Sequence, residues 1–199
     1  MAVRIYGNRS IKTLPGQDTR PTASRVREAL FNIWQGEITG CRWLDLCAGS
    51  GAMGAEALCR GAAVVVGMEQ SSRACRVIQQ NWQQVAQPNQ AFQVLRGDVL
   101  RLLPQLAAPP FDHIYFDPPY ASGLYEPVLQ AIAQHRLLAA DGVLVAEHSA
   151  NTTLPEAIAL EPDSEVQPGM AMLVCDRHKR YGQTSLTFYR WEHNTIEAI

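Results

Sequence analysis

Short apolar runs alternate with helix-like segments from residue 42 onward, and this alternation is the strongest constraint on the fold. The runs typical of strands cover residues 42–47, 63–68, 92–95, 111–116 and 143–147. Between them the sequence favours helices over residues 52–60, 71–85, 99–106 and 124–135. Repeated strand–helix units are typical of a parallel sheet with helices on both faces.

Two further alternating runs, residues 170–176 and 185–191, are joined across residues 178–182. Period-two alternation on both sides of a glycine-containing connection is typical of a β-hairpin. The sequence therefore predicts an α/β fold with a seven-stranded, mostly parallel sheet and a C-terminal antiparallel hairpin at one edge.

The first 40 residues stand outside the alternating pattern. Residues 3–6 and 11–14 could pair as a small hairpin, and Thr22 or Ser24 could cap a helix that reaches Trp34. This segment is too small to bury a core of its own. We expect residues 1–40 to form an extension packed on a main domain of residues 41–199.

The same extension is basic. Residues 1–30 carry six Lys or Arg and two acidic residues, a net charge of +4, which leaves −6 for the rest of a chain whose net charge is −2. A basic segment on an acidic body indicates contact with phosphates, although a solvated surface is the alternative. The predicted phosphate contacts are Arg4, Arg9, Lys12 and Arg20, extended by Lys179 and Arg180.

Polar and glycine residues follow the first three predicted strands, where ligands of open α/β sheets bind. A glycine-rich loop lets a ligand approach the backbone, and carboxylates ending the next strands can accept hydrogen bonds from a ribose and an adenine amine. The candidate residues for an adenosine-containing cofactor are Asp45, Ala48, Gly49, Ser50, Gly51, Glu69, Gln70, Asp98 and Val99.

Two cofactors fit this pattern. The spacing Gly49-x-Gly51-x-x-Gly54 matches the dinucleotide fingerprint, so NAD is one candidate. Asp45 lies four residues before the first glycine, where a carboxylate suits a cationic ligand better than a pyrophosphate. This favours S-adenosylmethionine, which carries a sulfonium and an ammonium group.

The tetrapeptide Asp117-Pro118-Pro119-Tyr120 follows the fourth predicted strand. The prolines end the strand because they cannot donate ladder hydrogen bonds. The resulting turn offers a carboxylate, backbone carbonyls and an aromatic ring, which together suit a flat ring bearing an exocyclic amine. These four residues are the candidate catalytic site.

In this order, Asp45 to Gly51, Glu69, Gly97-Asp98 and Asp117 to Tyr120 resemble the motifs of class I S-adenosylmethionine-dependent methyltransferases that act on exocyclic nitrogens. Residues 20–22 and 25–32 narrow the resemblance to the bacterial 16S ribosomal RNA guanine-N2 methyltransferase family. It implies a Rossmann-like fold, S-adenosylmethionine, and ribosomal RNA or the small ribosomal subunit as partner. The candidate RNA-contacting residues are then Arg4, Asn8, Arg9, Lys12, Arg20, Thr22, Arg25, Lys179 and Arg180.

Other functions compete with this interpretation. An adenine-N6 DNA methyltransferase shares the Asp-Pro-Pro-Tyr motif but normally needs an added recognition domain. Protein glutamine methylation prefers asparagine at position 117. An NAD-dependent oxidoreductase and a catalytically silent RNA-binding subunit are the alternatives from other classes.

Five cysteines form no Cys-x-x-Cys pair, so the sequence predicts neither a disulfide framework nor a metal site. No apolar stretch approaches the roughly 18 residues of a membrane span, and the N-terminus lacks a signal-peptide core. We expect a cytoplasmic, monomeric protein without a membrane or metal partner.

Overall fold

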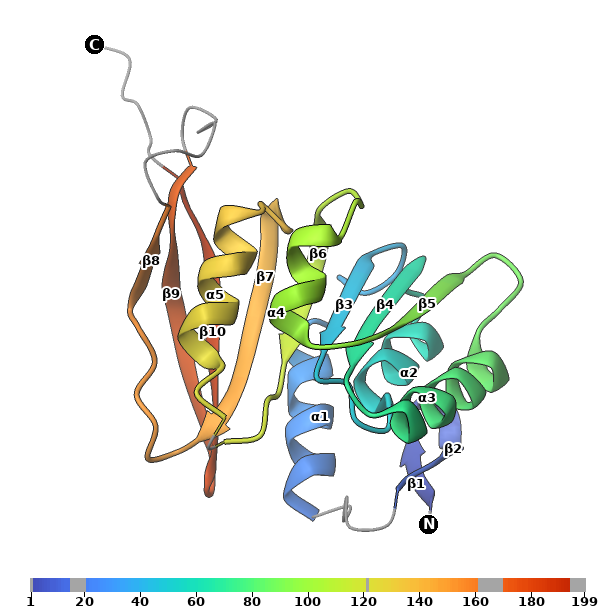
Figure 1. Ribbon diagram of the computed structural model, residues 1–199. Helices are drawn as coiled ribbons and strands as arrows, with labels where there is room; N and C mark the ends of the chain where they lie inside the picture. Colours follow the sequence, from blue (N-terminus) through green and yellow to red (C-terminus); the bar gives the residue numbers. More distant parts are fainter. Residues whose placement is uncertain (1, 15–20, 121, 161–169, 194–199) are drawn as a thin grey trace.

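The computed structural model describes residues 2–14, 21–120, 122–160 and 170–193. Eight strands form one sheet in the order β5-β4-β3-β6-β7-β10-β9-β8, with the first five parallel and the last three antiparallel to their neighbours (Figure 1). The strands are β3 Arg42–Leu46, β4 Val64–Glu69, β5 Ala91–Arg96, β6 Phe111–Phe116, β7 Leu138–Ser149, β8 Ala157–Ala159, β9 Met170–Tyr181 and β10 Thr184–His193.

Helices cover both faces of this sheet (Figure 1). One apolar cluster joins α1, α2 and α3 to one face, and a second joins α4 and α5 to the other. The helices are α1 Pro21–Ile33, α2 Ala52–Cys59, α3 Ser72–Val85, α4 Val99–Leu102 and α5 Tyr125–Gln134. In the described part of the chain, none of them is long and apolar enough to cross a membrane.

The predicted α/β fold class is confirmed, with differences at the C-terminal side. Within the described residues the sheet has eight strands instead of seven, because residues 157–159 pair with β9 as the short edge strand β8. β9 continues through His178 to Tyr181, so most of the predicted connection is strand. β7 begins at Leu138 rather than at residue 143, and its register against β6 shifts between Leu138 and Val143.

The N-terminal segment forms the hairpin β1 Ala2–Ile5 and β2 Arg9–Lys12, joined by the short 3-10 helix η1 Tyr6–Asn8. Val3, Ile5 and Ile11 are buried in the same cluster as α1, α2 and α3. Helix α1 begins at Pro21, before both predicted caps, because proline suits the first turn of a helix.

A buried carboxylate fixes this hairpin to the body. Glu56 of α2 is 2% exposed and accepts hydrogen bonds from the side chain of Arg27 (3.2 Å), the side chain of Arg60 (2.9 Å) and the backbone N–H of Tyr6 (3.1 Å). Arg27 in turn donates to the carbonyl of Arg4 at 2.6 Å. The ion pairs therefore hold β1 and α1 against α2.

The order of the strands determines where a ligand can bind. Along the chain the sheet grows from β3 to β4 and β5, then continues with β6 on the other side of β3. The connections after β3 and β6 therefore lead to opposite faces, which opens a crevice at the carboxyl ends of these two strands.

Candidate active site

The glycine-rich loop after β3 is shaped by an aromatic side chain. Gly51 has φ +73°, and its carbonyl accepts a hydrogen bond from Trp82 Nε1 at 2.8 Å. A Cβ on Gly54 would lie 2.3 Å from the Trp82 ring. Gly51 and Gly54, the second and third glycines of the dinucleotide-like spacing, are therefore explained by packing, because a side chain at either position would clash with Trp82.

Glu69 supports the loop from the end of β4. One of its carboxylate oxygens accepts from the N–H of Gly49 at 2.9 Å, and the other accepts from the N–H of Ser71 at 2.8 Å. The carboxylate therefore ties the loop to the start of α3, and its remaining lone pairs are free to accept from a ligand.

Asp98 follows β5 and caps α4, since its Oδ1 accepts from the N–H of Arg101 at 3.2 Å. It also lines the crevice, together with Val99. The position expected to contact an adenine amine is thus also a helix N-cap, and Oδ2 is the oxygen left for a ligand.

Asp45 lies deeper than its neighbours. Its residue is 1% exposed, and its Oδ2 accepts from the N–H of Gly54 at 3.0 Å. Burial, with the nearby carboxylate of Glu69, raises the pKa of Asp45 to about 8. A cation placed in the crevice would favour the ionised form of this carboxyl.

The tetrapeptide after β6 turns sharply away from the sheet. The carbonyl of Pro119 accepts from the N–H of Ser122 at 2.9 Å, which closes the turn. Tyr120 is 41% exposed, and its hydroxyl lies 3.5 Å from the Thr184 hydroxyl of β10. The aromatic ring therefore remains accessible at the rim, whereas Pro118 is buried.

Sequence reasoning missed Glu147 at the end of β7. Its carboxylate accepts a hydrogen bond from the hydroxyl of Tyr115, and its backbone carbonyl accepts from Tyr125. Burial raises the pKa of Glu147, and burial followed by the charge of Glu147 raises the pKa of Asp117 well above its usual range. No motif indicated Glu147, because only the β6–β7 pairing brings it beside Asp117.

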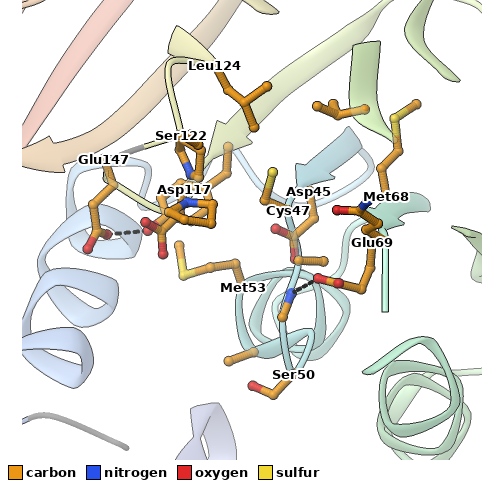
Figure 2. A pocket seen from close by; sticks show the side chains of 18 of the residues that line it. Asp45, Cys47, Ser50, Met53, Met68, Glu69, Asp117, Ser122, Leu124 and Glu147 are labelled. Carbon is orange, nitrogen blue, oxygen red and sulfur yellow. Dashed lines mark hydrogen bonds between the residues drawn. The ribbon is translucent and has the colours of Figure 1, made fainter. Parts of the chain in front are cut away.

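These residues line one pocket of about 950 Å³. Figure 2 shows Asp117 and Glu147 on one side of it and Glu69 on the other, with Asp45 and Cys47 between them. All the predicted catalytic and cofactor residues line the pocket except Gly51, which packs against Trp82. The lining also includes residues of the N-terminal segment that were not predicted, namely Val3, Thr13, Ser24 and Arg27.

The pocket is acidic at its centre. Cys47, held at φ +59° directly after β3, has its pKa raised to about 12 by burial and by four surrounding carboxyls. These carboxyls belong to Glu69, Asp117, Asp45 and Asp98. Such a site attracts cations and groups that donate hydrogen bonds.

Of the predicted RNA-contacting residues whose side chains the structure describes, none lines the pocket. Arg4, Asn8, Arg25, Lys179 and Arg180 are exposed. Arg9 and Lys12 are also exposed, but each already makes a hydrogen bond within the protein. The guanidinium of Arg9 donates to the carbonyl of Val85, and the ammonium of Lys12 donates to Gln80 Oε1. Arg20 lies outside the described residues, and Thr22 is part of α1.

Lys179 and Arg180 lie at the same edge of the sheet as the pocket. Arg180 pairs with Ser185, which pairs with His148 at the carboxyl end of β7. The carboxyl end of β7 is also that of β6, because the two strands are parallel. In the N-terminal segment the basic positions are divided, because Val3 and Thr13 reach the pocket, whereas Arg9 contacts Cys59 and Val85 at the C-terminal ends of α2 and α3, which lie at the opposite end of the sheet.

Comparison with known proteins gives consistent matches over nearly the whole chain. The family described as "Conserved hypothetical protein 95" matches residues 3–190. The "Putative rRNA methyltransferase YlbH" of Bacillus subtilis is 34% identical over 92% of this chain and 93% of its own length. The "Ribosomal RNA small subunit methyltransferase D" of Escherichia coli strain K12 is 31% identical over 77% of this chain and 78% of its own.

Among solved structures, the "Putative methyltransferase yhhF from Escherichia coli" superposes with a TM-score of 0.76 at 28% identity. The match covers 97% of this chain and 99% of that one. The likeness confirms the class I methyltransferase fold expected from the motifs.

Proposed function

Because the chain belongs to the family described as Conserved hypothetical protein 95, we propose that it is an S-adenosylmethionine-dependent methyltransferase acting on the exocyclic N2 of a guanine in 16S ribosomal RNA of the small subunit. The observation that carries this proposal is the acidic pocket at the carboxyl ends of β3 and β6, with Tyr120 accessible at its rim.

The chemistry of the pocket fits a cationic cofactor. Asp45, Glu69 and Asp98 surround the glycine loop, and their oxygens suit a sulfonium, an ammonium group, ribose hydroxyls and an adenine amine. A pyrophosphate would be repelled by the same carboxyls, which disfavours NAD. When bound, S-adenosylmethionine supplies a methyl group on a positively charged sulfur.

Asp117 and its neighbours would orient the amine. The Asp117 carboxylate and the Pro118 carbonyl can accept from the two N–H groups of N2, which favours a pyramidal nitrogen with its lone pair directed at the methyl carbon. Tyr120 would hold the purine by stacking, worth about 1–3 kcal/mol per base. Asp117 would take the proton that the nitrogen loses when it gains the methyl group in exchange for the departing thioether.

Ribosomal RNA requires a path for its phosphates. The exposed Arg4, Arg25, Lys179 and Arg180 provide positive charge beside the pocket but outside it. A base could thus enter the acidic pocket while its backbone stays among cations. We expect the protein to act as a cytoplasmic monomer on this partner.

The test uses 16S ribosomal RNA and assembled small subunits lacking guanine-N2 methylation, incubated with the protein and S-adenosylmethionine. Nucleoside mass spectrometry should detect N2-methylguanosine with the wild type and none with Asp117→Ala. A product of N6-methyladenosine would support the adenine alternative, and the absence of any methylated nucleoside on both substrates would contradict the proposal.

A further inference from the structure

A cluster of three metal-binding side chains lies away from the pocket, where β8 meets β9. It consists of Glu156, Cys175 and His178, whose ligand atoms all lie within 4.8 Å of one another. Cys175 Sγ is 3.2 Å from His178 Nε2, and Glu156 Oε1 is 3.5 Å from the same nitrogen. The pocket lining contains none of these three residues.

These separations match those of a tetrahedral zinc site. Zinc binds a thiolate sulfur at about 2.3 Å and an imidazole nitrogen at about 2.0–2.1 Å, so tetrahedral angles place sulfur and nitrogen roughly 3.5 Å apart. The same angles place nitrogen and a carboxylate oxygen about 3.4 Å apart. Both observed distances lie within about 0.4 Å of these values.

A β-bulge brings two of the ligands onto one face. Cys175 and His178 are three residues apart, so a regular strand would direct them to opposite faces of the sheet. Tyr189 pairs with Cys175 whereas the preceding Phe188 pairs with Arg177, which leaves Asp176 as the extra residue. The bulge thus places Cys175 and His178 on the same side of β9.

The backbone around Glu156 is held in place beside them. The N–H of Cys175 donates to the carbonyl of Glu156 at 2.7 Å, and the hydroxyl of Tyr189 donates to the carbonyl of Pro155 at 2.8 Å. The Glu156 side chain, which is 77% exposed, would lose the most freedom when a cation binds.

A chain of hydrogen bonds fixes which nitrogen of His178 is available. His148 Nδ1 lies 2.9 Å from the carbonyl of Ser149, which can only accept, so this nitrogen carries a proton. Burial lowers the pKa of His148, so its Nε2 is an acceptor near neutral pH. Nε2 therefore accepts from the hydroxyl of Thr187 at 2.8 Å.

The Thr187 oxygen is then left to accept from His178 Nδ1, at 2.9 Å. The proton of a neutral His178 consequently sits on Nδ1, and the lone pair of Nε2 points toward Cys175 and Glu156. Metal-binding histidines are oriented in this way, by a hydrogen bond from the nitrogen that does not bind the metal.

We propose that Glu156, Cys175 and His178 form a zinc site that fastens the β8 segment to β9, with Thr187 orienting the histidine. Sulfur, imidazole and carboxylate ligands together suit Zn²⁺ better than Mg²⁺ or Ca²⁺, which prefer oxygen alone. Water or another donor would complete the tetrahedron at the exposed side. The site is independent of methyl transfer.

The test titrates chelator-treated protein with ZnCl₂ in a calorimeter and with CoCl₂ in a spectrophotometer. The wild type should bind one zinc per chain, and cobalt should give a thiolate-to-cobalt charge-transfer band. Zinc at 100 times its Kd should raise the folded-to-unfolded ratio about 100-fold. Cys175→Ser and His178→Gln should each abolish the zinc-dependent stabilisation.

Matched variants separate this site from adventitious binding. Cys59→Ser and His135→Gln alter a half-buried thiol and an exposed imidazole elsewhere, and should bind zinc as the wild type does. Thr187→Val keeps the ligands and should weaken zinc affinity about 10–100-fold. The proposal is overturned if the wild type binds no zinc, or if Cys175→Ser keeps the stoichiometry and affinity of the wild type.

Discussion

Buried acidic residues occur in two regions of this molecule with opposite surroundings. Glu56, at the junction of α2 with the N-terminal hairpin, contacts the guanidinium groups of Arg27 and Arg60. In the pocket, burial raises the pKa of both Asp117 and Glu147, the charge of Glu147 raises that of Asp117 further, and no arginine partner compensates them among the described lining residues beside them. The first region compensates its buried charge within the chain, whereas the second concentrates charge of one sign.

The difference distinguishes a structural from a functional use of the same residue type. A buried carboxylate with two arginine partners holds segments together, and it stabilises the fold only while the partners remain. Carboxyls whose pKa is raised by burial and by neighbouring carboxyls reduce stability when they ionise, and such groups cluster where a ligand supplies the missing charge or hydrogen bonds. The pocket carboxyls are therefore expected to lower the free energy of unfolding of the ligand-free protein and to favour ligand binding.

The largest expected effect is on turnover. Asp117→Asn keeps the shape of the side chain but cannot accept the proton, so kcat should fall about 10²–10⁴-fold. The free energy of unfolding should stay equal or rise, because a carboxyl with a raised pKa is removed. Single-turnover methylation and urea unfolding measure the two quantities, with calorimetry of S-adenosylmethionine binding as the control for cofactor affinity. A variant with normal turnover would remove Asp117 from the mechanism.

Replacing the carboxylate of Glu56 by an amide should lower stability instead of turnover. Glu56→Gln leaves Arg27 buried without its ionic partner, so unfolding should become easier by about 3–5 kcal/mol. Urea unfolding measures the loss, and the double variant Arg27→Met with Glu56→Gln should recover part of it. If Glu56→Gln costs no more stability than Asp117→Asn, the distinction between the two regions is wrong.

The sequence predicted the parallel part of the sheet and about half of the residues that line the pocket, because both depend on local signals. Residues that directly follow a parallel strand lie at the carboxyl end of the sheet. The sequence therefore indicates the position of Asp-Pro-Pro-Tyr and of the glycine-rich loop without any information on distant contacts. Gly51 differs, since its conformation is set by Trp82, which lies 31 residues away along the chain.

Features that depend on pairing between distant segments were not predicted. Glu147 reaches Asp117 only through the register of β6 and β7, and β8 is a strand only because β9 pairs with it. The bulge at Asp176 is likewise a property of two strands. Hydrophobic alternation indicates which face of a strand is buried but not which residues of a distant strand it pairs with, so the C-terminal strands were recognised but their ends were wrong.

The pH dependence of stability is a further difference between the pocket and the Glu56 region. The pKa of Asp45 is about 8 in the folded protein and 3.8 in an unperturbed carboxyl, so between these values the folded state holds more protons than the unfolded state. Stability from this group is therefore present at low pH and lost as the pH rises toward 8, by at most about 1.4 kcal/mol per pH unit. Asp117 and Glu147, whose pKa values are also raised, act in the same direction.

Urea unfolding of the ligand-free protein at pH 5, 6, 7 and 8 measures this slope, and Asp45→Asn should make it shallower. Asn retains an oxygen that can accept from the N–H of Gly54. Glu56→Gln is the matched control for a loss of stability outside the pocket and should shift the whole curve down. An unchanged slope in Asp45→Asn would show that this carboxyl is ionised in the free pocket.

The smallest expected effect concerns the cations outside the pocket. If a base enters the acidic pocket, the phosphates must be neutralised around it, so Arg25→Ala and Arg180→Ala should each flatten the log–log salt dependence of RNA binding by roughly one unit. Arg190 is the matched control, because β10 carries it to the opposite end of the sheet, beside Asp176. Fluorescence anisotropy at several salt concentrations measures the slopes. Equal changes in Arg180→Ala and Arg190→Ala would mean that RNA does not follow the pocket edge, and that positive charge there serves only solubility.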